Sequence, residues 1–455
     1  MKEMTVSPLS RERPGRGPMV ARASLPELRG DQPCQEIAGF QEDLAGYIDR
    51  YAALWAGARC GPPTPITVFS PKEQRRNERE VDRLVLLIEK ELPDCPADFW
   101  QRKTWRERLL RELLKVAEER LGYPQSHLRI IFSPEYFSVT RTFVREARSF
   151  DHAISTEALS QALRNVWVMN WIQMFLGGIP AMSPSLFAYS LLYPYTDNFL
   201  DQSGVSTEDK VELNQNLGLR LAGEQVQARG SYDQVMFRLI GMIESEYPRS
   251  DFPEVFSALL AIQAGQVKSL MQQGESPALD ADETLRVSME KGGASVLADG
   301  YLVAGKLRRK AAAFCFGLGV LLQLSDDLQD LQSDLAATRW TIFSRTALRS
   351  SLDGTTSRLY WFMRRVLASA TRNSSSRCGV LTDLIRRNCL YLMLRAIAQN
   401  RQFYTAEYLK QMEPCSPLRF GYLEEQCRTV ESKYATVTGT LLAKRNIGSI
   451  FDLLD

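Results

Sequence analysis

Leu321–Asp334 reads LLQLSDDLQDLQSD and directly follows the apolar run AAAFCFGLGV at Ala311–Val320. Asp326 and Asp330 are four residues apart, and so are Asp330 and Asp334. Residues with this spacing share one face of an α-helix, where like charges repel. The stretch therefore predicts a buried helix whose acidic end either meets positive charge or points into water.

The composition is that of a large globular protein. The chain has 455 residues, of which 44% are hydrophobic and 24% are charged, and its formal net charge is +2. This balance does not indicate a nucleic-acid partner. The chain has only two histidines, His127 and His152, which argues against a zinc site and against Ser-His catalysis. A metal would have to be a hard cation held by carboxylates.

The cysteines and the apolar runs of the sequence indicate the expected subcellular location. Eight cysteines are scattered without a CxxC pair, which predicts reduced thiols and a cytoplasmic protein, with peripheral membrane association left open. The basic, proline-rich start of the chain lacks an apolar core and is expected to be a disordered arm. The longest apolar run, Ala311–Leu324, is shorter than the roughly 20 residues of a membrane span, so no transmembrane segment is expected.

Helical periodicity dominates the chain, and strand signals are sparse. Helices are expected over Leu159–Gly178, Ser183–Asp201, Thr284–Lys310 and Ala311–Leu335, among others. The predicted class is all-α. The expected segments are a disordered arm over 1–34, an N-terminal helical segment over 35–122, a helical domain over 123–400 and a C-terminal helical extension over 401–455.

A second pair of carboxylates occurs upstream, in YPYTDNFLDQ. Asp197 and Asp201 are four residues apart and therefore also share one helix face. Two such helices in one bundle could direct their carboxylates toward a common opening. Divalent cations between them would relieve the repulsion, and a diphosphate would complete the coordination of Mg²⁺.

These motifs resemble those of the class I isoprenoid synthases, which include prenyl diphosphate synthases, squalene and phytoene synthases and terpene cyclases. FGLGVLLQLSDDLQDLQSD is similar to their second aspartate-rich motif, and Gln323 also matches the prenyl synthase pattern. DNFLD is similar to the first motif. The resemblance covers Leu159–Ser344 and implies these metal ligands: Asp197, Asp201, Asp326, Asp327 and Asp330.

The resemblance implies a fold and a chemistry. The fold is a class I terpenoid synthase-like bundle around a central apolar cavity, with N-terminal helices and a C-terminal extension. Three Mg²⁺ ions, with Mn²⁺ as an alternative, would help to ionise a linear prenyl diphosphate and release pyrophosphate. The aromatic side chains expected to wall the cavity are Trp167, Trp171, Phe175, Tyr195, Phe199 and Tyr301. A homodimer is compatible with the resemblance.

Basic residues are expected to bind the diphosphate. Lys291 in SMEKGGASVLADG has the place of a diphosphate-binding lysine in prenyl synthases, whereas terpene cyclases have a helix break there. Arg339 and Arg345 in TRWTIFSR follow the second motif and could close over the diphosphate. Gln323 completes the set.

Other features depart from the family. The arginine pair that follows the first motif of elongating synthases is absent, and so are a GKxxR-type segment and an NSE/DTE motif. The favoured function is therefore a terpene synthase that acts on one prenyl diphosphate of C15 to C20 or longer. The alternatives are a prenyltransferase of the same fold, elongating or head-to-head, and a helical protein without activity.

Overall fold

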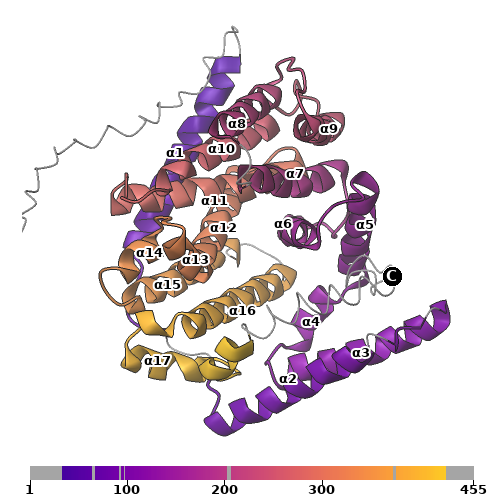
Figure 1. Cartoon of the computed structure of the whole chain (residues 1–455), viewed down its shortest axis with the longest axis vertical. Helices are drawn as coiled ribbons and strands as arrows, with labels where there is room; N and C mark the ends of the chain where they lie inside the picture. Colours follow the sequence, from indigo (N-terminus) through magenta and orange to yellow (C-terminus); the bar gives the residue numbers. More distant parts are fainter. Residues whose placement is uncertain are drawn as a thin grey trace, which may run out of the picture.

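The computed structural model describes residues 33–63, 67–91, 94–96, 98–201, 206–371 and 376–426. Within these ranges the chain is built from helices and contains no β-strand (Figure 1). The predicted all-α class is confirmed. The arm expected over 1–34 lies almost wholly outside the described residues, as does the end of the C-terminal extension after residue 426.

The described part of the chain forms seventeen α-helices, joined by short loops and 3₁₀ turns. Their bounds are α1 Pro33–Ala56, α2 Pro71–Glu91, α3 Phe99–Glu119, α4 Gln125–Ile131, α5 Pro134–Phe150, α6 Thr156–Phe175, α7 Pro184–Asp201, α8 Thr207–Ala222, α9 Ser231–Glu246, α10 Pro253–Ser269, α11 Ala281–Ala304, α12 Arg309–Gln329, α13 Leu331–Ala336, α14 Ile342–Ala347, α15 Asp353–Thr371, α16 Ser376–Gln399 and α17 Ala406–Met412.

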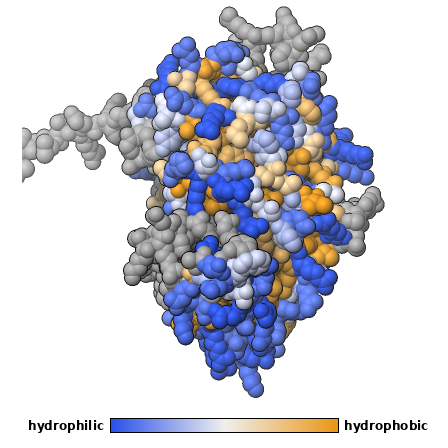
Figure 2. Space-filling view, turned by 90° about the vertical axis from the view of Figure 1, so that its right-hand side faces the viewer, coloured by the Kyte–Doolittle hydropathy of each residue, from blue (hydrophilic) through white to orange (hydrophobic). Residues whose placement is uncertain are grey.

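The helix α12 is the centre of the bundle, where it packs against α1, α11, α15 and α16. Most of its side chains from Ala312 to Leu328 are buried. Among the described helices it alone is long and apolar enough to cross a membrane, and 78% of its most apolar window is buried inside the protein. One face of the molecule is largely hydrophilic with smaller hydrophobic areas between the polar side chains (Figure 2).

Glycines let α11 and α12 approach very closely. A Cβ on Gly292 would lie 2.7 Å from the carbonyl oxygen of Gly319, and a Cβ on Gly319 would clash with the carbonyl of Gly292. A Cβ on Gly293 would clash with the ring of Phe316. The pair Gly292–Gly293 does not break the helix, because α11 is continuous from Ala281 to Ala304. These residues serve close helix packing instead.

The N-terminal helix α1 belongs to the bundle core. The phenol of Tyr51 donates a hydrogen bond to the carbonyl of Ala313 at 2.6 Å, and its ring stacks on Phe316. Trp55 packs edge-on against Phe362 of α15. The sequence pattern placed this helix in a segment ahead of the helical domain, but its buried aromatic side chains complete the core around α12.

The helices α2 and α3 pack side by side at the edge of the molecule (Figure 1). The C-terminal region holds α2 in place. The side chain of Gln74 donates hydrogen bonds to the carbonyls of Glu413 and Ser416, each at 2.9 Å, and the buried carboxylate of Glu78 pairs with Arg419. The described part of the C-terminal extension therefore links this helix pair to the rest of the chain.

Two predicted helix boundaries differ from the structure. The single helix expected over Ala311–Leu335 is divided at Asp330, where α12 ends and α13 begins. The helix expected over Thr284–Lys310 ends at Ala304, because Gly305 adopts a positive φ of 69° and reverses the chain. The first difference matters for the site, because it turns the chain between Asp327 and Asp334.

We expect Gly319→Ala to lower the free energy of unfolding by about 1–3 kcal/mol, because its methyl group would push α11 away from α12. Gly241→Ala in α9 is the matched control, since its Cβ would meet nothing within 4 Å. It should be neutral or stabilising by up to about 1 kcal/mol. Chemical unfolding followed by circular dichroism measures both, and equal effects of the two substitutions would contradict the packing argument.

Candidate active site

Asp327 is a buried carboxylate near the end of α12, with 6% of its surface exposed. Its Oδ1 accepts a hydrogen bond of 2.8 Å from Nε2 of Gln323, and its buried Oδ2 has no hydrogen-bond partner among the described residues. Burial, together with the charge of Asp326, raises the pKa of Asp327 to about 6, while Gln323, Ser288 and Lys291 oppose the increase. The hydrogen bond from Gln323 therefore orients the carboxylate through Oδ1, and Oδ2 is available to a ligand.

Asp334 in α13 lies in the same cluster and is 4% exposed. Burial raises its pKa to about 7, and the charge of Asp327 is the next largest cause. Nη1 of Arg339 lies 3.9 Å from Oδ1 of Asp334 and opposes the shift. The sequence motif did not assign Asp334 to the site, although its four-residue spacing from Asp330 was the signal that could have done so.

Asp330 lies at the junction of α12 and α13 and connects the cluster to α6. The residue is exposed overall, yet crowding around its carboxyl raises its pKa, and Arg164 and then Arg339 oppose the increase. Arg164 is an exposed residue of α6. It was not predicted from the sequence, because nothing in its neighbourhood resembles a motif. The fold brings this cation to the acidic cluster from a helix far away in the chain.

The helix α11 supplies Lys291 and a buried polar group beside Asp327. Lys291 lies within electrostatic range of Asp327 and lowers its pKa. Ser288, one turn earlier, accepts a hydrogen bond of 3.1 Å from Nε2 of Gln272, which also donates to the carbonyl of Thr284 at 3.2 Å. The close approach of α11 and α12 thus places a lysine and a hydroxyl at the carboxylate.

The two predicted arginines have different surroundings. The backbone N–H of Arg339 donates to the carbonyl of Asp334 at 2.8 Å, and Thr338 before it has a φ of 49°, which is strained for a β-branched residue. This tight turn places the exposed Arg339 beside the cluster. Nη1 of the buried Arg345 instead donates to the carbonyl of Leu279 at 2.8 Å, so this arginine anchors the loop before α11.

Asp197 and Asp201 belong to α7, but their side chains lie outside the described residues. The direction of α7 is nevertheless defined. The phenol of Tyr189 donates a hydrogen bond to the carbonyl of Ser295 at 3.3 Å. At the start of α7, the backbone N–H of Ser185 donates to the carboxylate of Glu246. The next residue, Tyr247, donates to the carbonyl of Leu302 in α11. The helix α7 therefore runs antiparallel to α11.

A buried acid ties α6 and α7 to α11. Asp299 is fully buried and accepts a hydrogen bond of 3.1 Å from Asn165, which also donates to Ser190 at 3.2 Å. Burial raises the pKa of Asp299 well above its usual range, while the hydrogen bond from Asn165 opposes the increase. The three side chains fix the relative positions of the helices that carry Arg164, Asp197 and Lys291.

The aromatic side chains predicted to wall a cavity mostly face neighbouring helices. The indole of Trp167 donates to Thr140 of α5 at 3.2 Å, the phenol of Tyr195 bonds to Asp151, and Tyr301 faces Phe40 of α1. Phe175 lies against Phe314, with ring centroids 4.8 Å apart, and joins α6 to α12. The side chain of Phe199 lies outside the described residues. The central apolar cavity remains a prediction.

The donor set fits a hard divalent cation. The cluster offers carboxylate oxygens, including the unpartnered Oδ2 of Asp327, and burial together with neighbouring carboxylates raises the pKa values of Asp327 and Asp334. The described residues contain no group of three or more Asp, Glu, His or Cys side chains placed to hold a metal by themselves. Mg²⁺ needs only one or two carboxylates when water and phosphate supply the other ligands.

No protein-family model matches the chain, and no curated protein matches its sequence.

We expect Asp334→Asn to stabilise the metal-free protein at pH 8 by about 1–3 kcal/mol. Its pKa is about 7 in the folded state and 3.8 in the unfolded state. Between these values the folded state holds a proton that the unfolded state has lost, so stability falls as the pH rises through this window. Unfolding in the presence of EDTA at pH 5 and pH 8 measures the effect, which should be smaller at pH 5.

The exposed Asp94→Asn is the control and should leave the pH dependence unchanged. If Asp334→Asn gives no gain at pH 8, the carboxyl of Asp334 is not destabilised by its surroundings in the folded protein.

Proposed function

We propose that the protein is a Mg²⁺-dependent class I terpene synthase. It ionises a linear prenyl diphosphate of C15 to C20 or longer, releases pyrophosphate and then cyclises or deprotonates the carbocation. One observation supports this proposal above the others: three elements, one of them more than a hundred residues away in the sequence from the other two, bring carboxylates and cations to one place. They are the junction of α12 and α13, the helix α11 with Lys291, and the helix α6 with Arg164.

The carboxylates of the cluster would hold the metal ions that bind the diphosphate. Asp327 and Asp330 would hold Mg²⁺, together with Asp326, Asp334 and the first-motif pair Asp197 and Asp201. Mg²⁺ bound there would neutralise the diphosphate and so make it a good leaving group. Gln323 keeps Oδ1 of Asp327 engaged, which leaves Oδ2 available.

Three cations would bind the oxygens of the diphosphate directly. Lys291, Arg164 and Arg339 lie around the acidic cluster on separate elements, and each has donors that suit phosphate oxygens. As negative charge moves to the leaving diphosphate, these fixed cations stabilise it without reorganisation. Gln323 stays with Asp327, and Arg345 supports the site from the Leu279 loop.

The decisive experiment is turnover by the purified chain. Farnesyl, geranylgeranyl and longer diphosphates are incubated with Mg²⁺, with and without isopentenyl diphosphate, and pyrophosphate and organic products are measured. A hydrocarbon or alcohol from a single diphosphate supports the terpene synthase. Longer diphosphates that form only with isopentenyl diphosphate, or head-to-head products, identify the prenyltransferase alternative. Absence of Mg²⁺-dependent turnover with any of these substrates refutes both.

We expect Asp327→Asn to lower the rate of pyrophosphate release by about 10²-fold or more, because it removes the best-oriented carboxylate of the cluster. The change conserves side-chain volume, and circular dichroism should show an unchanged helix content. Asp94→Asn on the surface is the matched control and should keep full activity. Wild-type rates in Asp327→Asn would remove Asp327 from the mechanism.

We expect Arg164→Gln to raise the KM for the prenyl diphosphate about tenfold, since it removes one cation that faces the diphosphate site. The helix α6 should remain folded, because Arg164 is exposed. Arg129→Gln, an exposed arginine of α4, is the control. An unchanged KM in Arg164→Gln would show that α6 does not contribute to diphosphate binding.

A further inference from the structure

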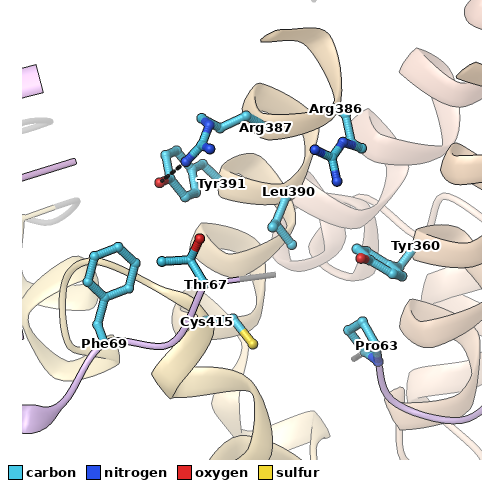
Figure 3. A pocket seen from close by; sticks show the side chains of 9 residues that line it. All are labelled: Pro63, Thr67, Phe69, Tyr360, Arg386, Arg387, Leu390, Tyr391 and Cys415. Atoms are coloured by element: carbon cyan, nitrogen blue, oxygen red, sulfur yellow. Dashed lines mark hydrogen bonds between the residues drawn. The ribbon is translucent and has the colours of Figure 1, made fainter. Parts of the chain in front are cut away.

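A second concentration of positive charge lies in a pocket between the segment before α2 and the helices α15 and α16. Arg386 and Arg387 of α16 line one side of this pocket, and Phe69, Thr67 and Cys415 lie across from them (Figure 3). The acidic cluster contributes no residue to it. Among the described residues that line the pocket there is no Asp or Glu.

Arg387 has no acidic partner among the described residues. It is half-buried, and its guanidinium donates a hydrogen bond of 3.3 Å to the phenol of Tyr391. That phenol in turn donates to the carbonyl of Leu121 at 2.6 Å. Nε of Arg387 is buried and has no hydrogen-bond partner in the described part of the chain. A partly desolvated guanidinium with unused donors is unfavourable unless an anion compensates it.

The neighbouring charges do not neutralise Arg387. Arg386 pairs with Asp383, whose carboxylate also lies 3.1 Å from Nε2 of His127. Burial lowers the pKa of His127, so this imidazole is neutral at pH 7. One carboxylate therefore balances Arg386, and the charge of Arg387 is left over.

The size and walls of the pocket limit what it can hold. The cavity measures about 40 Å³, which is room for about three water molecules or one compact anion. Tyr360 and Thr67 line it together with Phe69 and Leu390. Hydroxyl groups thus add donors, and the apolar walls strengthen the field of the guanidinium groups.

We propose that this pocket is a binding site for a small oxyanion of the phosphate or carboxylate class, held by Arg387 and assisted by Arg386. The site also has a structural consequence. Gly122, at the end of the α3 segment with a φ of 72°, lies against Arg387, because a Cβ on it would be 3.3 Å from Nη1. A bound anion would therefore fasten the segment around α2 and α3 to α16. The proposal is independent of the terpene synthase activity.

Isothermal titration calorimetry of the full chain with inorganic phosphate tests the proposal, in buffer with EDTA and at constant ionic strength. Wild type and Asp327→Asn should bind phosphate with the same Kd, because the acidic cluster is not involved. Arg387→Gln should weaken binding about tenfold or more. Arg129→Gln on the surface of α4 is the control and should not change the Kd. Acetate in place of phosphate shows whether the site accepts any oxyanion or only phosphate.

A second variant guards against loss of folding. Leu390→Trp keeps both arginines and fills the pocket, so it should abolish phosphate binding while the circular dichroism spectrum stays unchanged. Equal phosphate affinity in wild type and Arg387→Gln would overturn the proposal. Absence of binding to the wild type at phosphate concentrations up to about 10 mM would also overturn it, because a site with a Kd above this value is too weak to be useful. Binding that is lost in Lys291→Gln but kept in Arg387→Gln would assign the phosphate to the cations around the acidic cluster instead.

Discussion

The close contact between α11 and α12 is the constraint on which the rest of the structure depends. Gly292 and Gly319 meet with almost no space between their backbones, and Phe316 fills the place that a side chain on Gly293 would take. This contact sets the height of Lys291 and Ser288 relative to Asp327. If α11 and α12 were a few ångströms further apart, Lys291 would no longer lie near the carboxylate of Asp327. The same helix contact therefore determines the packing of the apolar core and the electrostatics of the site.

The acidic cluster is electrostatically unfavourable in the folded state. Burial raises the pKa values of Asp327 and Asp334, and neighbouring carboxylates add to the increase: Asp326 acts on Asp327, and Asp327 acts on Asp334. Such a group would be out of place in a helical protein without a ligand, because replacing it with neutral side chains would relieve the repulsion. Cations from α6, from α11 and from the Arg339 turn lie close by, yet they oppose the shifts without cancelling them. Residual negative potential of this kind suits a divalent cation.

The sequence predicted the all-α class and the acidic end of the central helix, because hydrophobic periodicity and carboxylate spacing are local signals. It also placed Lys291, Gln323 and Arg339 near Asp327, through the resemblance. It did not predict Arg164, since a cation that comes to the site through tertiary packing leaves no local pattern. Nor did it predict that α1 enters the core through Tyr51, or that the helix turns at Asp330. The first depends on a contact between Tyr51 and Ala313, which are 262 residues apart in the sequence.

Asp299 shows why the two predicted motifs depend on each other physically. Its buried carboxyl is joined to Asn165 of α6 and, through it, to Ser190 of α7. Hydrogen-bonded polar groups in a low-dielectric core fix helix positions, because separating them would leave buried donors and acceptors unpaired. The residues Asp197 and Asp201 follow Ser190 in α7, and Lys291 precedes Asp299 in α11. The helix α11, which supplies Lys291 beside Asp327, thus also positions the helix α7 that carries Asp197 and Asp201, and any shift of α11 would act on both.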